Sequence, residues 1–172
     1  LLRRLGVAMR VLPVEDENWI ARSLEGLPPV RTERFFIYGE HSASDVPANA
    51  IGLKIEASYA FGTGHHGTTR GCLIAFEHLA KRRTFRNALD LGCGTGVLGL
   101  AFARLTHRPV VATDIDPLAV RKTRENARLN RAAPHIRIAH ADGFRARDIA
   151  SGAPYDLIFA NILAGPLVKL MP

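Results

Sequence analysis

The sequence predicts an α/β domain built on a doubly wound, mostly parallel sheet. From Ile51 onward, short apolar segments of strand length alternate with amphipathic segments of helix length. The segments expected to form the core strands each end in a polar residue or a glycine turn, as in "ALDLG", "VVATD", "AHAD" and "IFAN". Ligands of such sheets bind at the carboxyl ends of the strands, where the strand order reverses, so we expect the chemistry at this edge.

The composition is that of a globular protein and narrows the class of function only slightly. No run approaches the roughly 20 apolar residues of a membrane helix. Cys72 and Cys93 form no C-x-x-C pair, which predicts a reducing, cytoplasmic setting and no structural zinc. A net charge of +7 suits an acidic partner or a ribonucleoprotein environment, but an ordinary basic surface explains it equally well.

Residues 1–49 differ from the rest of the chain. A short helix is expected around Trp19 over 15–27, and Pro28 and Pro29 stop it. A strand is expected over 33–39 and a polar loop over 40–50. Because this part lacks the apolar periodicity of an independent core, we interpret 1–49 as an interdomain linker and the tail of a preceding domain.

The alternation begins with a strand over 51–57. Further strands are expected over 87–92, 109–116, 135–142 and 155–163, and helices over 68–82, 96–107, 117–131 and 165–172. The helix at 117–131 has Pro117 in its first turn and Asp116 as its cap, and its basic residues are expected to form a solvated face.

The glycine turn in "LDLGCGTG" is the strongest functional signal. Gly92, Gly94 and Gly96 allow the backbone to turn sharply after a strand and a ligand to approach closely. The segment from Gly94 to Gly99 also fits G-x-G-x-x-G, so a dinucleotide site has to be considered.

Two carboxylates near the turn bear on the choice between a dinucleotide and another ligand, and Asp90 is the one that discriminates. Asp114 lies about 20 residues after the turn and suits the ribose hydroxyls of either ligand. Asp90, directly before the glycines, would repel a pyrophosphate and attract a cation such as the amino group of S-adenosylmethionine (SAM). The pattern therefore favours SAM over NAD, and both over a turn without a ligand.

Three further residues follow core strands and are candidates for the same site. Ile115 could pack against an adenine ring, and Asp142 could accept from the adenine amino group or simply serve the turn before Gly143. Asn161 offers an acceptor that could orient an amine toward a methyl group, or it could close a turn before Pro166.

The segment "FGTGHHGTT", residues 61–69, has the glycine spacing of a phosphate loop. Thr68 stands where such a loop needs lysine, which argues against phosphate binding. The adjacent His65 and His66 lack partners at metal-ligand spacing, so we interpret them as loop residues rather than as a metal site or a general base. The glycines fit a segment that folds over a cofactor, with Thr69 as a polar contact.

Taken in order, "AFGTGHHGTT", "DLGCGTG", "ATDIDP" and "ANILAGPL" resemble the PrmA family of class I SAM-dependent methyltransferases, which methylate ribosomal protein L-eleven. The resemblance covers 51–172, and the Trp19 helix and "RFFIYG" are similar to the interdomain segment of that family. It implies a Rossmann-like fold, a cytoplasmic enzyme that uses SAM, and trimethylation of lysine side chains and the amino terminus of a large-subunit ribosomal protein. It implies no metal, no membrane and no specific nucleic acid as partner.

By the resemblance, Thr69, Gly92, Asp114 and Asn161 match cofactor-contacting positions. Phe61 and Thr63 lie in the loop that closes over cofactor and substrate, and Thr63 and Asn161 are the candidate catalytic residues. Related glutamine and DNA amino methyltransferases carry an N-P-P-Y-type motif where this chain reads Asn-Ile-Leu-Ala over 161–164.

The family also carries an amino-terminal recognition domain and a sheet of seven strands. We therefore expect 50–172 to be a SAM-binding domain that is truncated after its fourth core strand. Two other functions stay open: a SAM-dependent RNA or small-molecule methyltransferase, and an NAD-binding or non-catalytic Rossmann module.

Overall fold

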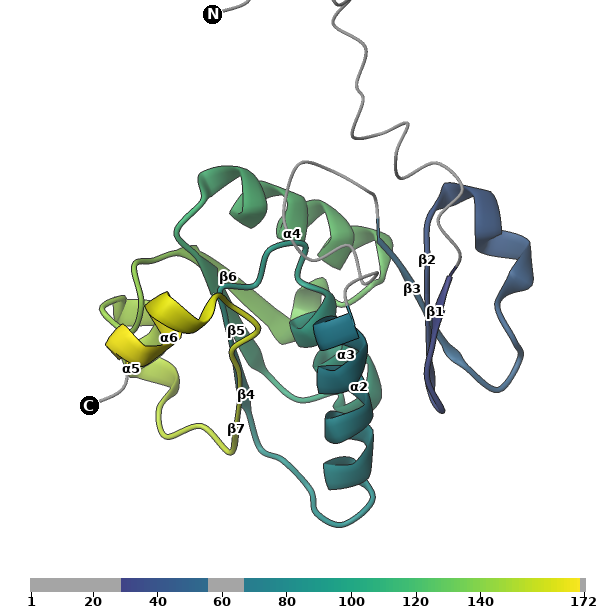
Figure 1. The fold of residues 1–172 in the computed structure, drawn as a ribbon, viewed down its shortest axis with the longest axis horizontal. Coiled ribbons are helices and arrows are strands. Elements are labelled where there is room, and N and C mark those ends of the chain that lie inside the picture. The colour runs from purple at the N-terminus through teal and green to yellow at the C-terminus, as the bar shows by residue number, and fades with distance from the viewer. Residues whose placement is uncertain (1–28, 56–66, 171–172) are drawn as a thin grey trace, which may run out of the picture.

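The computed structural model describes residues 29–55 and 67–170 (Figure 1). Its strands are β1 (Val30–Arg31), β2 (Phe35–Tyr38), β3 (Ile51–Lys54), β4 (Ala88–Leu91), β5 (Val110–Asp114), β6 (Ile136–His140) and β7 (Leu157–Phe159). Its helices are α2 (Gly67–Ala80), α3 (Val97–Thr106), α4 (Pro117–Leu129), α5 (Arg147–Gly152) and α6 (Ala164–Leu170), with 3-10 turns η2 (Glu40–Asp45) and η3 (Ala133–His135). Within these residues, no helix has the length and apolar character needed to cross a membrane.

The larger sheet has four parallel strands in the order β6-β5-β4-β7. The chain winds outward from β4 through β5 to β6 and then returns to place β7 on the other side of β4. The strand order therefore reverses between β4 and β7, which places the expected ligand crevice beyond the carboxyl end of β4. The predicted doubly wound, parallel α/β sheet is confirmed.

Helices cover both faces of this sheet because its strands are apolar on both sides (Figure 1). On one face, Ala88 and Ala112 join a buried cluster with side chains of α2, α3 and α4. On the other face, Leu89 and Val111 pack with Ile149 of α5. Such two-sided burial explains why these strands read as continuous apolar runs.

The smaller sheet has the order β1-β2-β3, with β1 and β2 antiparallel and β2 and β3 parallel. Phe35 of β2 is fully buried and stacks on Phe76 of α2, with ring centroids 6.2 Å apart. The predicted boundary between the linker (1–49) and the SAM-binding domain (50–172) falls between β2 and β3. Side chains of both strands belong to one buried core together with side chains of α2 and α3.

Two buried polar side chains attach this small sheet to the helices. Glu77 of α2 accepts hydrogen bonds from the Thr32 hydroxyl and from the Arg34 amide, at 2.8 Å for the latter. Asn130, at the end of α4, accepts from the Lys54 amide at 2.8 Å and donates to the Lys54 carbonyl at 2.7 Å. The Asn130 side chain thus pairs with β3 as a neighbouring strand would.

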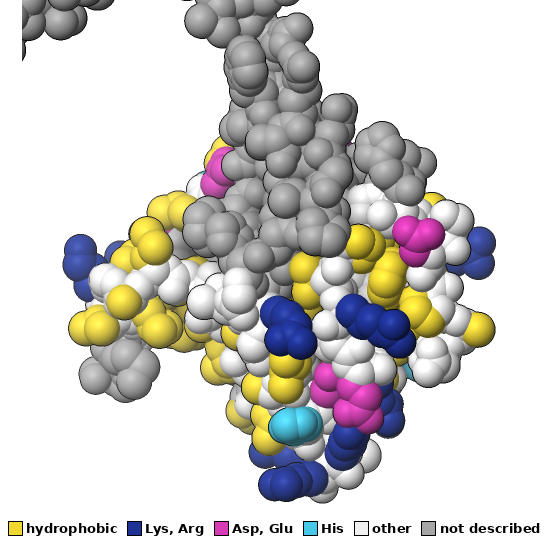
Figure 2. Space-filling view, turned by 45° about the vertical axis from the view of Figure 1, so that its right-hand side comes forward, with side chains coloured by type: hydrophobic (Ala, Val, Ile, Leu, Met, Phe, Trp, Pro, Cys, Tyr) yellow, Lys and Arg dark blue, Asp and Glu magenta, His cyan; other side chains and the backbone are white. Residues whose placement is uncertain are grey.

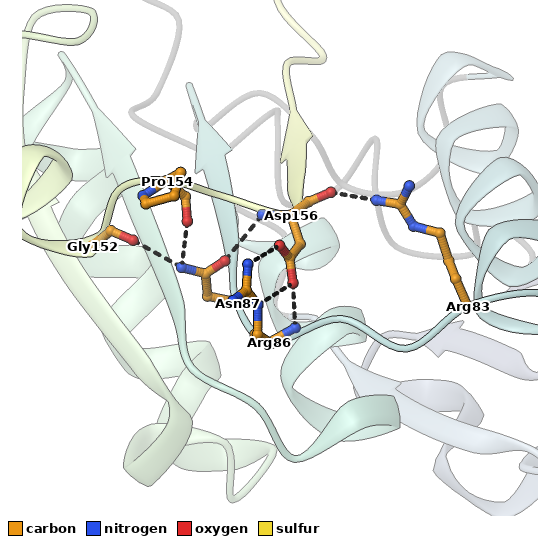
Figure 3. A network of polar contacts seen from close by, with 6 residues as sticks. All are labelled: Arg83, Arg86, Asn87, Gly152, Pro154 and Asp156. Atoms are coloured by element: carbon orange, nitrogen blue, oxygen red, sulfur yellow. Dashed lines mark hydrogen bonds and ion pairs between the residues drawn. The ribbon is translucent and has the colours of Figure 1, made fainter.

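A polar network joins β4 to β7 at their amino ends, opposite the ligand edge (Figure 3). Asn87 donates to the Gly152 carbonyl at 2.8 Å and the Pro154 carbonyl at 3.0 Å, and accepts from the Asp156 amide at 3.0 Å. The Arg86 guanidinium contacts both carboxylate oxygens of Asp156, which holds the pKa of Asp156 below its usual value. This network fixes β7 beside β4 at the amino ends of the two strands, opposite the edge where a ligand is expected.

Most expected elements are present, and the differences have local causes. Helix α5 and strand β1 were not expected, because α5 has six residues with only Ile149 buried and β1 has two residues. The expected loop over 40–50 contains η2, and the last strand ends at Phe159 rather than at 163. The helix expected around Trp19 lies outside the described residues.

Candidate functional site

A cavity of about 440 Å³ lies at the carboxyl edge of the four-stranded sheet. It is formed by the segments that follow β4, β5, β6 and β7, together with the first turn of α2. The predicted cofactor residues in its wall are Thr69, Asp90, Gly92, Gly94, Asp114, Ile115, Asp142 and Asn161. The structure thus brings together side chains that are up to 92 positions apart in the sequence.

The glycine turn needs its glycines for conformation and for space. Gly92, Gly94 and Gly96 have φ of 69°, 56° and 81°, in the left-handed region that side chains disfavour. A Cβ on Gly92 would lie 2.3 Å from Cγ2 of Ile162, which follows β7. This close contact brings the turn after β4 and the segment after β7 together at the reversal point.

Gly96 is placed differently from the other two glycines. It is not among the residues that line the cavity and instead forms the N-cap of α3. A Cβ on Gly96 would lie 2.6 Å from Cγ2 of Thr123 in α4. Its role in the described structure is close packing between the turn and α4.

Asp114 holds the glycine turn through its carboxylate. Oδ2 accepts from the Gly94 amide at 2.8 Å, and Oδ1 accepts from the Asp116 amide at 2.9 Å. Each carboxylate oxygen has a further lone pair with which it can accept a hydroxyl. Ile115, with 64% of its surface exposed, provides an apolar wall beside this carboxylate that suits a flat ring.

Asp116 caps α4, as predicted from the sequence. Its side chain accepts from the Leu118 amide at 2.8 Å, and Pro117 occupies the first turn. Asp114 is therefore free of this capping role, although it lies only two residues away.

Asp90 is buried at the end of β4, with 2% of its surface exposed. The Gly99 amide in the first turn of α3 donates to its Oδ2 at 2.8 Å. Burial raises the pKa of Asp90 to about 7, the nearby charge of Asp114 adds to the rise, and the Gly99 hydrogen bond opposes it. Among the described residues, no basic side chain lies close enough to Asp90 to lower its pKa, so a cation in the cavity would stabilise the ionised form.

Asn161 and Thr69 contact each other across the cavity wall. The Asn161 side-chain amide donates to the hydroxyl of Thr69 at 3.0 Å, and Thr69 is fully buried. This contact fixes how the Asn161 amide group is turned, and Oδ1, the acceptor of the amide, can accept from a ligand.

Several wall residues were missed from the sequence. Cys93, Ile162, Lys169 and Leu170 all line the cavity. Leu170 of α6 packs over Gly143, where a Cβ would lie 2.6 Å from its Cδ2. Ile162 could have been found from its position beside Asn161 at the strand end, whereas the contacts of α6 depend on tertiary packing.

Some predicted residues cannot be placed. Phe61, Thr63, His65 and His66 lie outside the described residues.

Among the residues described, no group of three or more His, Cys, Asp or Glu side chains is arranged to hold a metal ion. On the face drawn in Figure 2, Lys and Arg side chains are interspersed with acidic and apolar ones.

Comparison with known proteins identifies the family. The family model for "Ribosomal protein L11 methyltransferase (PrmA)" matches residues 4–172. The chain belongs to this family. The resemblance of the four sequence motifs to PrmA is thereby confirmed.

Members of the PrmA family with high identity are found in bacteria. The chain is 53% identical over 155 residues to a ribosomal protein L11 methyltransferase of Caulobacter sp. (strain K31), covering 90% of this chain and 53% of that protein. It is 49% identical over 177 residues to the same-named protein of Rhizobium meliloti (strain 1021), covering 100% of this chain and 61% of that protein. The chain therefore spans somewhat more than half the length of these PrmA relatives.

A solved structure of the PrmA family has the same fold. The crystal structure of ribosomal protein L11 methylase from Lactobacillus delbrueckii subsp. bulgaricus aligns with a TM-score of 0.64 at 27% identity, over 83% of this chain and 70% of that chain. The class I methyltransferase fold predicted for this PrmA family member is therefore confirmed.

Proposed function

We propose that this chain binds SAM in the cavity at the carboxyl edge and takes part in methyl transfer to amino groups of ribosomal protein L11. The observation that carries this proposal is the buried Asp90 carboxylate beside a glycine turn that is already folded. This carboxylate is in the cavity wall and has a raised pKa, so a cationic amino group is the ligand that would stabilise its charge.

The remaining wall residues suit the other parts of SAM. Gly92 and Gly94 let the ligand approach the backbone closely, and Asp114 can accept from ribose hydroxyls while it holds Gly94. Ile115 offers an apolar surface for the adenine ring, and Asp142 an acceptor for its amino group.

Asn161 is the residue we propose to orient the attacking amine. When bound, the cofactor supplies a methyl group on a sulfonium. In the transfer, the amine lone pair would form the new bond to the methyl carbon while the carbon–sulfur bond breaks and its electron pair stays on sulfur. An acceptor at Asn161 Oδ1 would align the amine by holding one of its N–H groups, and water or a nearby carboxylate would take the proton of the ammonium before attack.

Three further assignments remain proposals. Thr63, which lies outside the described residues, is proposed as a second catalytic residue. Residues 1–49 are proposed to link a preceding substrate-recognition domain to the SAM-binding domain at 50–172. The substrate is proposed from the names of the relatives, and as a ribosomal protein it would place the enzyme in the cytoplasm.

The test is a pair of measurements on the full-length protein. Calorimetric titration with SAM should give saturable binding in the micromolar range, with no binding of NADH, and methyl-labelled SAM should label purified L11. Asp90→Asn should weaken SAM binding, while Asp156→Asn, at the opposite pole, serves as the matched control and should not.

Binding of NADH without SAM would establish the dinucleotide alternative instead. Transfer of label to ribosomal RNA or to a small molecule, with none to L11, would support the second methyltransferase alternative. Unchanged SAM binding in D90N would contradict the amino-group role of Asp90.

A further inference from the structure

The buried face of α4 carries two polar side chains that point at the glycine turn. Thr123 and Asn126 are both fully buried. The Thr123 hydroxyl donates to the Gly94 carbonyl at 2.9 Å, and the Asn126 amide donates to the Thr95 carbonyl at 2.9 Å. Two successive carbonyls of the turn are thus bonded to α4, which directs them away from the cavity.

Thr123 also accepts a hydrogen bond from the turn. Its Oγ1 lies 3.4 Å from Sγ of Cys93. Since the single proton of the Thr123 hydroxyl is donated to Gly94, the Cys93 thiol is the donor in this second contact. Burial raises the pKa of the Cys93 thiol, which keeps the proton needed for this donation. Cys93, Thr123 and Gly94 are thus joined by two linked hydrogen bonds, and Cys93 and Gly94 both line the cavity.

The methyl group of Thr123 has a separate role. It occupies the space beside Gly96, where a Cβ would come within 2.6 Å. Thr123 thus contacts the turn in two ways, by a hydrogen bond to Gly94 and by packing against Gly96. These two contacts can be removed one at a time.

Three backbone amides of the turn already have acceptors within the protein. The Cys93 amide donates to the Thr113 carbonyl at 2.9 Å, the Gly96 amide to the Cys93 carbonyl at 2.7 Å, and the Gly94 amide to Asp114. A turn that is folded before binding avoids the cost of ordering it when the ligand arrives.

We propose that Thr123 is a positioning residue of the SAM site, whose hydroxyl fixes the Gly94 peptide in the orientation that SAM binds. Thr123 does not line the cavity, so it acts through the turn rather than by touching SAM. The inference rests on the proposed SAM binding and deepens it, because it assigns part of the affinity to a residue outside the wall.

The test uses two substitutions that separate the hydroxyl from the methyl group, in the full-length protein. Thr123→Val keeps the shape and removes the hydroxyl, and it should raise the Kd for SAM about five- to tenfold. Thr123→Ser keeps the hydroxyl and removes the methyl, and it should bind SAM within twofold of the wild type although it unfolds at a lower temperature. For a residue with a purely structural role, affinity would fall with stability in both variants, whereas T123S is expected to lose stability and keep its affinity for SAM.

Thr106→Val is the matched control. The Thr106 hydroxyl donates to the Phe102 carbonyl at 2.7 Å in the last turn of α3, away from the cavity. This variant loses the same kind of hydrogen bond and should keep the wild-type Kd. If T123V is too unstable to purify, Asn126→Ala removes the donor to the Thr95 carbonyl and should weaken SAM binding in the same direction.

Wild-type affinity in T123V, or in N126A where that variant replaces it, would overturn the inference. Equal weakening in T123S and T123V would also overturn it, because the hydroxyl would then not be the cause. Failure of the wild-type protein to bind SAM is a different result, and it would overturn the proposed function instead.

Discussion

The side-chain amide of Asn161 donates a hydrogen bond to the hydroxyl of Thr69 over 3.0 Å. One residue follows β7 and the other lies in the first turn of α2, so this contact connects two segments of the cavity wall that are distant in sequence. It also orients Asn161, because it fixes how the amide group is turned and Oδ1, the acceptor of the amide, can accept from a ligand.

Replacing Thr69 should therefore disturb Asn161. Thr69→Val removes the acceptor and leaves the Asn161 amide nitrogen without this partner. We expect kcat/KM for SAM to fall about tenfold, from the loss of one hydrogen bond in a buried setting. Thr69→Ser restores the hydroxyl and should recover most of the activity in initial-rate assays, and a poorly active T69S variant would count against the hydrogen bond as the cause.

SAM binding should depend on pH through Asp90. Its pKa of about 7 in the free protein means that the carboxylate is largely protonated at pH 6 and largely ionised at pH 8. Because the ionised form is the one that attracts a cation, the apparent Kd for SAM should fall about tenfold from pH 6 to pH 8. Asp90→Asn should flatten this profile in calorimetric titrations, and a profile as steep as that of the wild type would assign the dependence to another group.

Stability should show the opposite pH dependence when no ligand is present. The pKa of Asp90 is raised in the folded state, from 3.8 to about 7, so the folded protein binds this proton more tightly than the unfolded chain does. This contribution to the free energy of unfolding is fully present below pH 4 and is lost as the pH rises to 7. Compared with D90N in urea unfolding, the wild type should lose stability across this window, and parallel curves would contradict the raised pKa.

Two glycine-to-alanine substitutions should have opposite effects on stability. Gly96→Ala places a side chain at φ 81° and within 2.6 Å of Thr123, which should cost about 2 kcal/mol or more. Gly71→Ala lies inside α2, where a Cβ meets nothing within 4 Å, and should stabilise the helix by about 0.5–1 kcal/mol. Urea unfolding at fixed pH measures both changes in the free energy of unfolding. If the two changes had the same sign, local geometry would not control the effect at these positions.

Asn87→Ala should lower the stability of the protein without changing its affinity for SAM. Asn87 makes three hydrogen bonds to the segment before β7, so its loss should lower the free energy of unfolding by about 1–2 kcal/mol. The network lies at the amino ends of the strands, opposite the cavity (Figure 3). The Kd for SAM should therefore stay at the wild-type value, and a change in Kd larger than twofold would mean that the two poles of the sheet are coupled.

The sequence was sufficient for the core strands and for eight of the 19 residues that line the cavity. Strands such as β4 and β5 were found because burial on both faces gives continuous apolar runs, and parallel pairing then brings their polar ends to one edge. Asp114 and Asn161 were found for this reason. Helix α5 was missed because a segment of six residues with only one buried side chain shows no recognisable hydrophobic periodicity in the sequence.

The residues of α4 that contact the glycine turn could not be predicted from the pattern of apolar strands and polar strand ends. The exposed arginines of α4 gave the expected solvated face, but Thr123 and Asn126 on its other side look like ordinary helix residues in the sequence. Their importance depends on the distance between α4 and the glycine turn, which is a tertiary property. The Gly96 position shows the same limit, because the motif predicts a tight turn but not that α4 packs against it.

The contact between Asn130 and Lys54 lies at an edge of the smaller sheet. Among the described residues, no further strand pairs with β3 on the side away from β2, toward which the Lys54 amide and carbonyl point. The Asn130 side-chain amide occupies this position, because its N–H donates to the Lys54 carbonyl and its oxygen accepts from the Lys54 amide, as a backbone peptide group would. A side chain at the end of α4 thus takes the place of a neighbouring strand along part of this edge, and its loss would remove these two hydrogen bonds to the backbone of β3.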